Sequence, residues 1–136
     1  MDYCFATAEE KDDNMGATLV MYDHKMKSLW AIQVEHKGAV DYVVKWCLNK
    51  FEESGYLGSR ITLKSDQEPS MVALKDAIAA ARVGDTAFIE SPVRESKSNG
   101  AAERAIRTWE GMMRTWKHFL EAKLKLKIPG NHALMG

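Results

Sequence analysis

The stretch from residue 95 to 107, ESKSNGAAERAIR, joins a polar loop to the start of a strongly amphipathic helix that carries Glu103 in its first turn. On a helix with about 100° per residue, the charged residues of this stretch and its continuation gather in an arc of about 80°. They are Glu103, Arg107, Glu110, Arg114 and Lys117. A carboxylate near a helix start, in line with two arginines, indicates a site that faces an anion.

The same spacing also has a purely structural explanation. Acidic residues in the first turn of a helix are favoured by the helix dipole, and Glu103 with Arg107 forms an ordinary i,i+4 pair. If Gly100 is the N-cap, an acid three residues later also reaches back to the cap. On spacing alone, the structural explanation is the stronger of the two.

Composition limits the classes of protein to consider. The chain has 136 residues, enough for one domain with a real core. It carries 19 basic and 19 acidic residues, so its net charge is zero. This balance argues against a protein whose whole surface binds nucleic acid, and leaves the region 94–117 as the candidate patch.

Cysteine and histidine usage predicts neither a disulfide framework nor a structural zinc site. Cys4 and Cys47 lie far apart, and the four histidines are scattered without ligand spacing. No apolar run reaches the ~20 residues that cross a bilayer, and the start of the chain has no signal-peptide pattern. We therefore expect an intracellular protein with free thiols and no membrane partner.

Hydrophobic periodicity and turn residues predict strands and helices in an alternating order. The predicted strands cover 1–8, 16–22, 28–35, 59–65 and 86–90, and the predicted helices cover 39–54, 69–84 and the stretch from 100 onward. The second and third strands form an antiparallel hairpin in this prediction, Gly55 ends the first helix and Pro69 begins the second. A hairpin followed by alternating helices and strands predicts an α/β fold with a mixed sheet and helices on its faces.

The long final helix presents one apolar face over an arc of roughly 140°. We expect this face to lie in the core along its whole length. Its members are Ala102, Ala105, Ile106, Trp109, Met112, Met113, Trp116, Phe119 and Leu120.

A resemblance to a known family adds to these patterns. The string Asn99-Gly100-Ala101-Ala102-Glu103-Arg104 resembles the NG-x-x-E-R motif in the catalytic core of retrotransposon and retroviral integrases, most closely the copia type. The predicted element order is also that of the ribonuclease-H-like fold, a mixed five-stranded sheet flanked by helices. The resemblance extends over nearly the whole chain, and it implies a single catalytic-core domain over residues 1–136.

The resemblance implies a catalytic site of three carboxylates, Asp2, Asp66 and Glu103, that hold two Mg²⁺ or Mn²⁺ ions. Between Asp66 and Glu103 lie 36 residues, close to the usual interval in the family. Two such ions can stabilise both the attacking and the leaving oxygen of an in-line phosphoryl transfer, and they prefer carboxylate ligands. The implied activity is trimming of transposon DNA ends followed by strand transfer into target DNA.

Each of these three acids has an alternative. Asp66 follows a strand and precedes a proline, where aspartate is also favoured as a turn or cap residue. Asp23, at the end of the second predicted strand, competes with Asp2 as an acid at a strand terminus. Glu90 and Glu95 compete for the place of the third ligand, but neither has the motif and the helical mount together.

DNA contacts implied by the resemblance fall in two places. The loop 91–98 corresponds to the family's active-site loop, and at its end it leads into the motif; the candidate contacts are Arg94, Lys97 and Asn99 from this stretch and Arg107, Arg114 and Lys117 from the helix. The implied partners are transposon ends, target DNA and further copies of the chain. The implied location is the nucleus or a transposon particle.

Two departures leave other functions open. The sequence begins within the predicted central strand and stops within a helix, and it lacks the zinc-binding N-terminal and the C-terminal DNA-binding domains of a full integrase. We therefore expect a truncated piece of a transposon polyprotein. The alternatives are a DNA-binding or assembly remnant without catalysis, and a ribonuclease-H-like nuclease without strand transfer.

Overall fold

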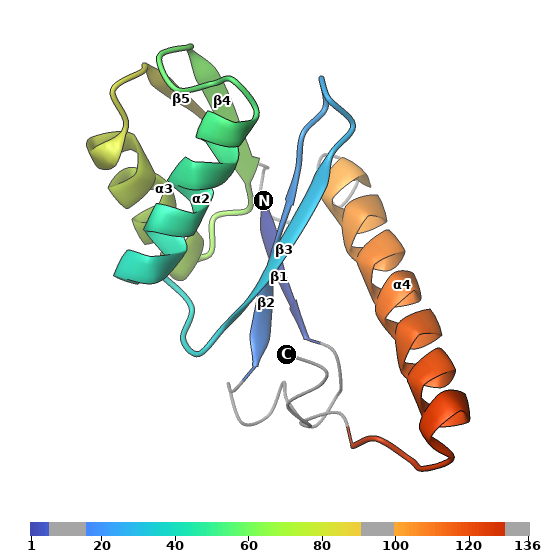
Figure 1. Ribbon diagram of the computed structural model, residues 1–136. Helices are drawn as coiled ribbons and strands as arrows, with labels where there is room; N and C mark the ends of the chain where they lie inside the picture. The colour runs from blue at the N-terminus through green and yellow to red at the C-terminus, as the bar shows by residue number, and fades with distance from the viewer. Residues whose placement is uncertain (6–15, 91–99, 130–136) are drawn as a thin grey trace. The chain divides into compact units, whose positions relative to one another are not determined.

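A computed structural model describes residues 1–5, 16–90 and 100–129 (Figure 1). The described residues form helices together with one antiparallel and one parallel sheet, so the predicted α/β class is confirmed. They divide into two compact units. The first unit contains Met1 and residues 36–100, and the second contains the described residues of 2–35 and 101–136.

The first unit is a strand–helix–strand arrangement with one more helix ahead of it. Its elements in chain order are α2 (Asp41–Glu53), β4 (Ile61–Ser65), α3 (Pro69–Ala81) and β5 (Thr86–Glu90). The two strands are parallel, which requires a crossover connection, and α3 supplies it. The strand register places Ser65 opposite Glu90, so the carboxyl ends of β4 and β5 lie side by side.

Helix α2 follows its sequence pattern closely. Val43, Cys47 and Phe51 recur every four residues on one face, and all three are buried. Gly55 ends the helix with φ of 79°, and the backbone N–H of Tyr56 donates to the carbonyl of Phe51 at 2.8 Å. This is the Schellman arrangement that glycine favours, and it confirms Gly55 as the end of the helix.

Helix α3 begins at Pro69, as predicted, because proline lacks only an N–H that the first turn would leave unpaired. Its inner face buries Met71, Leu74 and Ile78, and it contacts α2. Lys75 lies on the same inner face and is also buried, which the sequence pattern did not predict.

Arg82 ties together the loops at the far end of the first unit. Its guanidinium donates to the carbonyls of Tyr56 and Ser59 at 2.7 and 2.8 Å and to the hydroxyl of Thr86 at 2.7 Å. Gly84 lies so close to this junction that a Cβ there would approach the carbonyl oxygen of Ser59 to 2.6 Å. The first unit therefore has no room for a side chain at residue 84.

The second unit contains an antiparallel sheet in the order β1-β2-β3. The strands are β1 (Asp2–Phe5), β2 (Ala17–Tyr22) and β3 (Leu29–Val34). The predicted hairpin is confirmed, because β2 and β3 pair from Ala17 opposite Val34 to Tyr22 opposite Leu29. Pairing is seen within each of the two sheets, and one five-stranded mixed sheet stays a prediction.

Helix α4 (Gly100–Leu124) runs along this antiparallel sheet (Figure 1). A small core joins them through Cys4 of β1, Val20 of β2 and Ala105 of α4. Ile106 and Trp109 pack against this core from the helix. All of these helix residues belong to its N-terminal half, so this half is the part that the sheet covers.

The C-terminal half of α4 corrects the prediction of a continuous buried face. Met112, Trp116 and Phe119 retain 45%, 62% and 57% of their surface exposed. The rings of Trp116 and Phe119 instead contact each other edge to face, with centroids 6.5 Å apart. The amphipathic pattern predicted an apolar face correctly, but in the described residues much of its second half is exposed. No helix of the described part is both long and apolar enough to span a membrane.

Candidate functional site

The three predicted catalytic carboxylates are divided between the two units. Asp66 belongs to the first unit, whereas Asp2 and Glu103 belong to the second. Each stands at an element terminus: Asp2 begins β1, Asp66 directly follows β4, and Glu103 lies in the first turn of α4. All three side chains belong to residues of intermediate exposure, so solvent ions can reach them.

Asp66 shapes the turn between β4 and α3. Its Oδ1 accepts a hydrogen bond from the backbone N–H of Glu68 at 3.3 Å, and its carbonyl accepts one from the hydroxyl of Ser65 at 2.8 Å. Ser65 is fully buried, which fixes the exit of the strand. The turn role that the sequence left open is therefore present, and it also orients the carboxylate at the strand end.

Glu68 is a second acid in this turn, and its charge is already compensated. Its carboxylate accepts hydrogen bonds from Nζ of Lys37 at 3.0 Å and from the hydroxyl of Ser70 at 2.8 Å. Burial alone would raise the pKa of Glu68, but these hydrogen bonds and the charge of Lys37 lower the pKa below its usual value. Glu68 is thus an ionised residue that pairs with Lys37.

Asp2 lies at the start of the edge strand β1, opposite Val20 of β2. Its Oδ1 accepts a hydrogen bond from the backbone N–H of Tyr3 at 2.8 Å. Because side chains alternate along a strand, Asp2 and Cys4 lie on the same face, and Cys4 packs against α4. Asp2 therefore lies on the helix-facing side of the sheet.

Glu110 is an acid of this region that the sequence pattern did not single out as a site residue. The pKa of the Cys4 thiol is raised to about 12, mainly by burial and further by the charges of Glu110 and then Asp2. Both carboxylates therefore lie near the same buried thiol. The spacing of seven residues from Glu103, two helical turns on one face, was the sequence signal that could have identified Glu110.

Asp23, the competitor of Asp2, has a clear structural role. Its Oδ1 accepts hydrogen bonds from the backbone N–H groups of Lys25 and Met26 at 2.7 and 3.2 Å. These bonds close the turn between β2 and β3, where aspartate is favoured. The hairpin turn thus explains this acid without a ligand role.

Glu90, the competitor of Glu103, ends β5 beside a buried lysine. Its Oε1 lies 4.0 Å from Nζ of Lys75, whose side chain is only 2% exposed. The ammonium group also lies 5.5 Å from the ring centroid of Phe88, and it has no hydrogen-bond partner in the described residues. The position of Glu90 is therefore explained by a lysine that needs a counter-charge.

The predicted DNA contacts on α4 follow the expected face. Arg107 and Arg114 are exposed, and Lys117 is half-buried. Arg94, Lys97 and Asn99, together with the competing acid Glu95, lie outside the described residues. The helix alone therefore offers three basic side chains in line with Glu103.

The described residues offer carboxylates, histidines and two thiols as possible metal ligands. Within residues 1–5, 16–90 and 100–129, no group of three or more histidine, cysteine, aspartate or glutamate side chains gathers tightly enough to hold an ion. Cys47 and Cys4 are buried free thiols, and burial raises the pKa of the Cys47 thiol to about 12 as well. Thiolate ligation is therefore disfavoured, and carboxylates are the donor type that the chain offers to a hard cation.

Comparison with known proteins finds no matching family model, no matching curated protein and no matching solved structure.

Proposed function

We propose that this chain is the catalytic core of a copia-type retrotransposon integrase. It would carry out metal-dependent phosphoryl transfer on DNA: processing of transposon ends, then attack of the 3′-hydroxyl on target DNA. A ribonuclease-H-like mixed sheet of five strands is part of the same proposal. The observation that carries it is the string from Asn99 to Arg104 at the start of a long helix, with Glu103 in the first turn.

The placement of the other two acids supports this proposal. Asp66 follows β4 without an intervening residue, and Asp2 is the first residue of β1. Acids at strand ends and in the first turn of a helix sit on backbone that secondary structure holds rigid, as a metal site requires. The order of the described elements, hairpin first and then alternating helices and strands, agrees with the proposal.

In the proposed mechanism, Asp2, Asp66 and Glu103 would hold two Mg²⁺ or Mn²⁺ ions. When bound, the ions stabilise charge on the attacking and leaving oxygens of the phosphodiester. The hydrogen bond from the Glu68 backbone orients the carboxylate of Asp66. Arg107, Arg114 and Lys117 would bind DNA phosphates and hold the strand along α4, because charged donors pair strongly with phosphate.

Partners and location follow from this proposal. The substrates would be transposon ends and target DNA, and the chain would act with further copies of itself in the nucleus or in a transposon particle. Two alternatives predict different products. A nuclease without strand transfer would cut DNA but not join it, and an assembly or binding remnant would bind DNA without cutting it.

Cleavage of supercoiled plasmid in Mn²⁺ tests the enzymatic part of the proposal. We expect nicking by the unchanged chain and its loss in Glu103→Gln, since the substitution removes one ligand charge at nearly constant shape. Glu52→Gln, the same change at an exposed position of α2, is the matched control and should nick normally. DNA binding without nicking in all three proteins would favour the binding remnant.

A further inference from the structure

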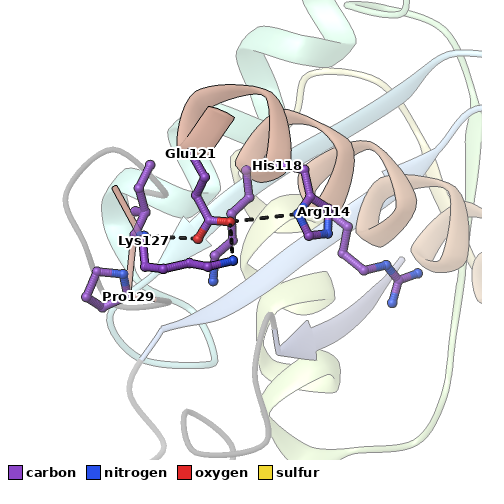
Figure 2. A pocket seen from close by; sticks show the side chains of 7 residues that line it. Arg114, His118, Glu121, Lys127 and Pro129 are labelled. Atoms are coloured by element: carbon purple, nitrogen blue, oxygen red, sulfur yellow. Dashed lines mark hydrogen bonds and ion pairs between the residues drawn. The ribbon is translucent and has the colours of Figure 1, made fainter. Parts of the chain in front are cut away.

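The C-terminal half of α4 and the segment that follows it line an open cavity of about 510 Å³ on the surface of the protein (Figure 2). All of its lining residues belong to the second unit and to its described part. Three cations line it, Arg114, Lys117 and Lys127, together with His118 and Glu121. Ile128 and Pro129 provide an apolar wall.

The wall is held in place by the backbone. Helix α4 ends at Leu124, and Lys125 then adopts a left-handed conformation with φ of 55° that turns the chain out of the helix. Four residues after the helix end, the N–H of Ile128 donates to Oε1 of Glu121 at 3.0 Å, and Ile128 is only 2% exposed. The left-handed residue and the hydrogen bond together hold the returning segment against the end of α4.

Among the described residues, Glu121 is the one carboxylate that lines the cavity, and its side chain contacts Lys127 and Ile128 of the segment after the helix. The backbone hydrogen bond from Ile128 lowers the pKa of Glu121; burial opposes it, and Lys127 and Lys117 add to the lowering. Nζ of Lys127 and Nδ1 of His118 lie 3.5 and 3.7 Å from Oε2 of Glu121. Figure 2 shows the guanidinium of Arg114 turned away from this carboxylate.

The charges that line the cavity favour an anion. Three cations against one carboxylate leave a formal excess of two positive charges, whereas the net charge of the chain is zero. The cavity volume is within the range of about 300–1,000 Å³ that small-ligand sites span. Basic side chains around an apolar wall fit a ligand that has both a charged and a flat apolar part.

We propose that this cavity binds one nucleotide, with its phosphate on Arg114 and Lys117 and its base against Pro129. A cavity of this size takes a single small unit, whereas an acidic peptide would need an extended groove. The same chemistry is offered by a free nucleoside monophosphate and by the unpaired, 5′-phosphorylated end of a DNA strand.

This nucleotide site needs no metal, but as a DNA site it rests on the proposed function, because Arg114 and Lys117 are also proposed contacts to DNA phosphates. Both residues share the face of α4 that carries Glu103, eleven and fourteen residues away. At about 1.5 Å per residue, the helix separates Glu103 from Arg114 by roughly 16 Å. A strand that reached the cavity would therefore run along the predicted DNA-binding face.

Displacement of a labelled DNA from the full chain in EDTA tests the proposal. The probe is a fluorescein-labelled duplex with an unpaired, 5′-phosphorylated tail, followed by fluorescence anisotropy, with a blunt duplex for comparison. The competitors are a nucleoside 5′-monophosphate, the nucleoside without phosphate, and poly-glutamate. EDTA removes divalent ions, so failure of the proposed metal chemistry leaves this measurement unchanged.

We expect the monophosphate to displace the tail, and the nucleoside and poly-glutamate to be much weaker competitors. Arg114→Gln and Lys117→Gln should each weaken monophosphate binding about fivefold, whereas Lys123→Gln, an exposed position elsewhere on α4, should change it less than about twofold. Circular dichroism checks that the variants are folded. Monophosphate binding without a preference for the tailed duplex would identify a free nucleotide as the ligand.

Three results would overturn the proposal. The first is no displacement at millimolar monophosphate, and the second is equal loss of binding in Lys123→Gln, which would indicate general electrostatic attraction. The third is displacement by poly-glutamate as effective as that by the nucleotide, which would identify an acidic peptide as the ligand instead.

Discussion

Helices α3 and α4 differ sharply in how much of their apolar face is buried. Helix α3 is 13 residues long and buries four residues, whereas α4 is 25 residues long and buries one, Ala105. Yet α4 has the stronger amphipathic pattern of the two, with its charged and apolar residues in separate arcs. The difference shows that periodicity defines which face of a helix is apolar, whereas burial depends on the surface available to cover that face.

The largest effect on the free energy of unfolding is expected from a substitution in the core of the first unit. Leu74→Ala removes a fully buried side chain of α3 and should lower the free energy of unfolding by about 2–5 kcal/mol. The control is Leu57→Ala, the same change at a side chain that is 56% exposed, which should stay within about 0.5 kcal/mol. Urea denaturation of both variants measures the contrast, and similar losses would contradict the assigned burial.

Lys75 sharpens the comparison because it is a buried polar residue on the well-packed face of α3. Lys75→Met keeps the volume of the side chain and removes an ammonium that has no hydrogen-bond partner in the described part. A hydrophobic residue of similar volume often stabilises a protein when it replaces a buried ion. We therefore expect the free energy of unfolding to rise by about 1 kcal/mol. A clear destabilisation in thermal unfolding would show that the pairing with Glu90 is worth more than the burial costs.

The reactivity of the Cys4 thiol tests how the N-terminal half of α4 packs on the sheet. Its folded pKa of about 12 lies above the usual thiol value, so the folded state keeps the proton that the unfolded state loses. The stability from this thiol is therefore complete below pH ~8.5 and is lost as the pH rises toward 12. We expect alkylation of native Cys4 at pH 8 to be slow, and Glu110→Gln to shift its onset to lower pH because one raising charge is gone.

The same alkylation needs a control for the second thiol. Cys47→Ser leaves Cys4 as the single cysteine of the chain. If Glu110→Gln leaves the pH dependence of this variant unchanged, the placement of Glu110 near Cys4 is wrong.

The smallest effect is expected in the exposed half of α4. Trp116→Ala should change the free energy of unfolding by no more than about 0.5 kcal/mol, because the side chain is 62% exposed. Trp109→Ala, at the same face but packed against the core of the sheet, should cost clearly more. Equal costs in chemical denaturation would mean that the second half of the helix is covered after all.

The sequence predicted local structure well, because the signals for helix and strand ends are local. Gly55 has no steric penalty at positive φ, Pro69 suits a first helical turn, and the hairpin has its polar turn between two apolar strands. The α/β class followed from the order of these elements. The helix end at Gly55, the helix start at Pro69 and the hairpin could each be predicted from neighbouring residues alone.

Features that depend on distant contacts could not be predicted in the same way. A lysine within an apolar helix pattern is normally exposed, so the burial of Lys75 depends on the strand packed beneath it. The exposure of Trp116 depends on where the sheet ends, and the cavity depends on a left-handed conformation at Lys125, which is rare for lysine. For the candidate site, the sequence identified the acids at element ends but not the nearness of Glu110 to Cys4.

The most direct test of the central claim is a strand-joining assay. A labelled oligonucleotide duplex with a free 3′-hydroxyl is incubated with the chain, Mn²⁺ and unlabelled plasmid, and the label covalently attached to plasmid is measured on a denaturing gel. The proposed integrase core predicts joined product from the unchanged chain and none from Asp66→Asn or Glu103→Gln. Bound but unjoined DNA with the unchanged chain, or equal joining by Glu103→Gln, would contradict the proposed function.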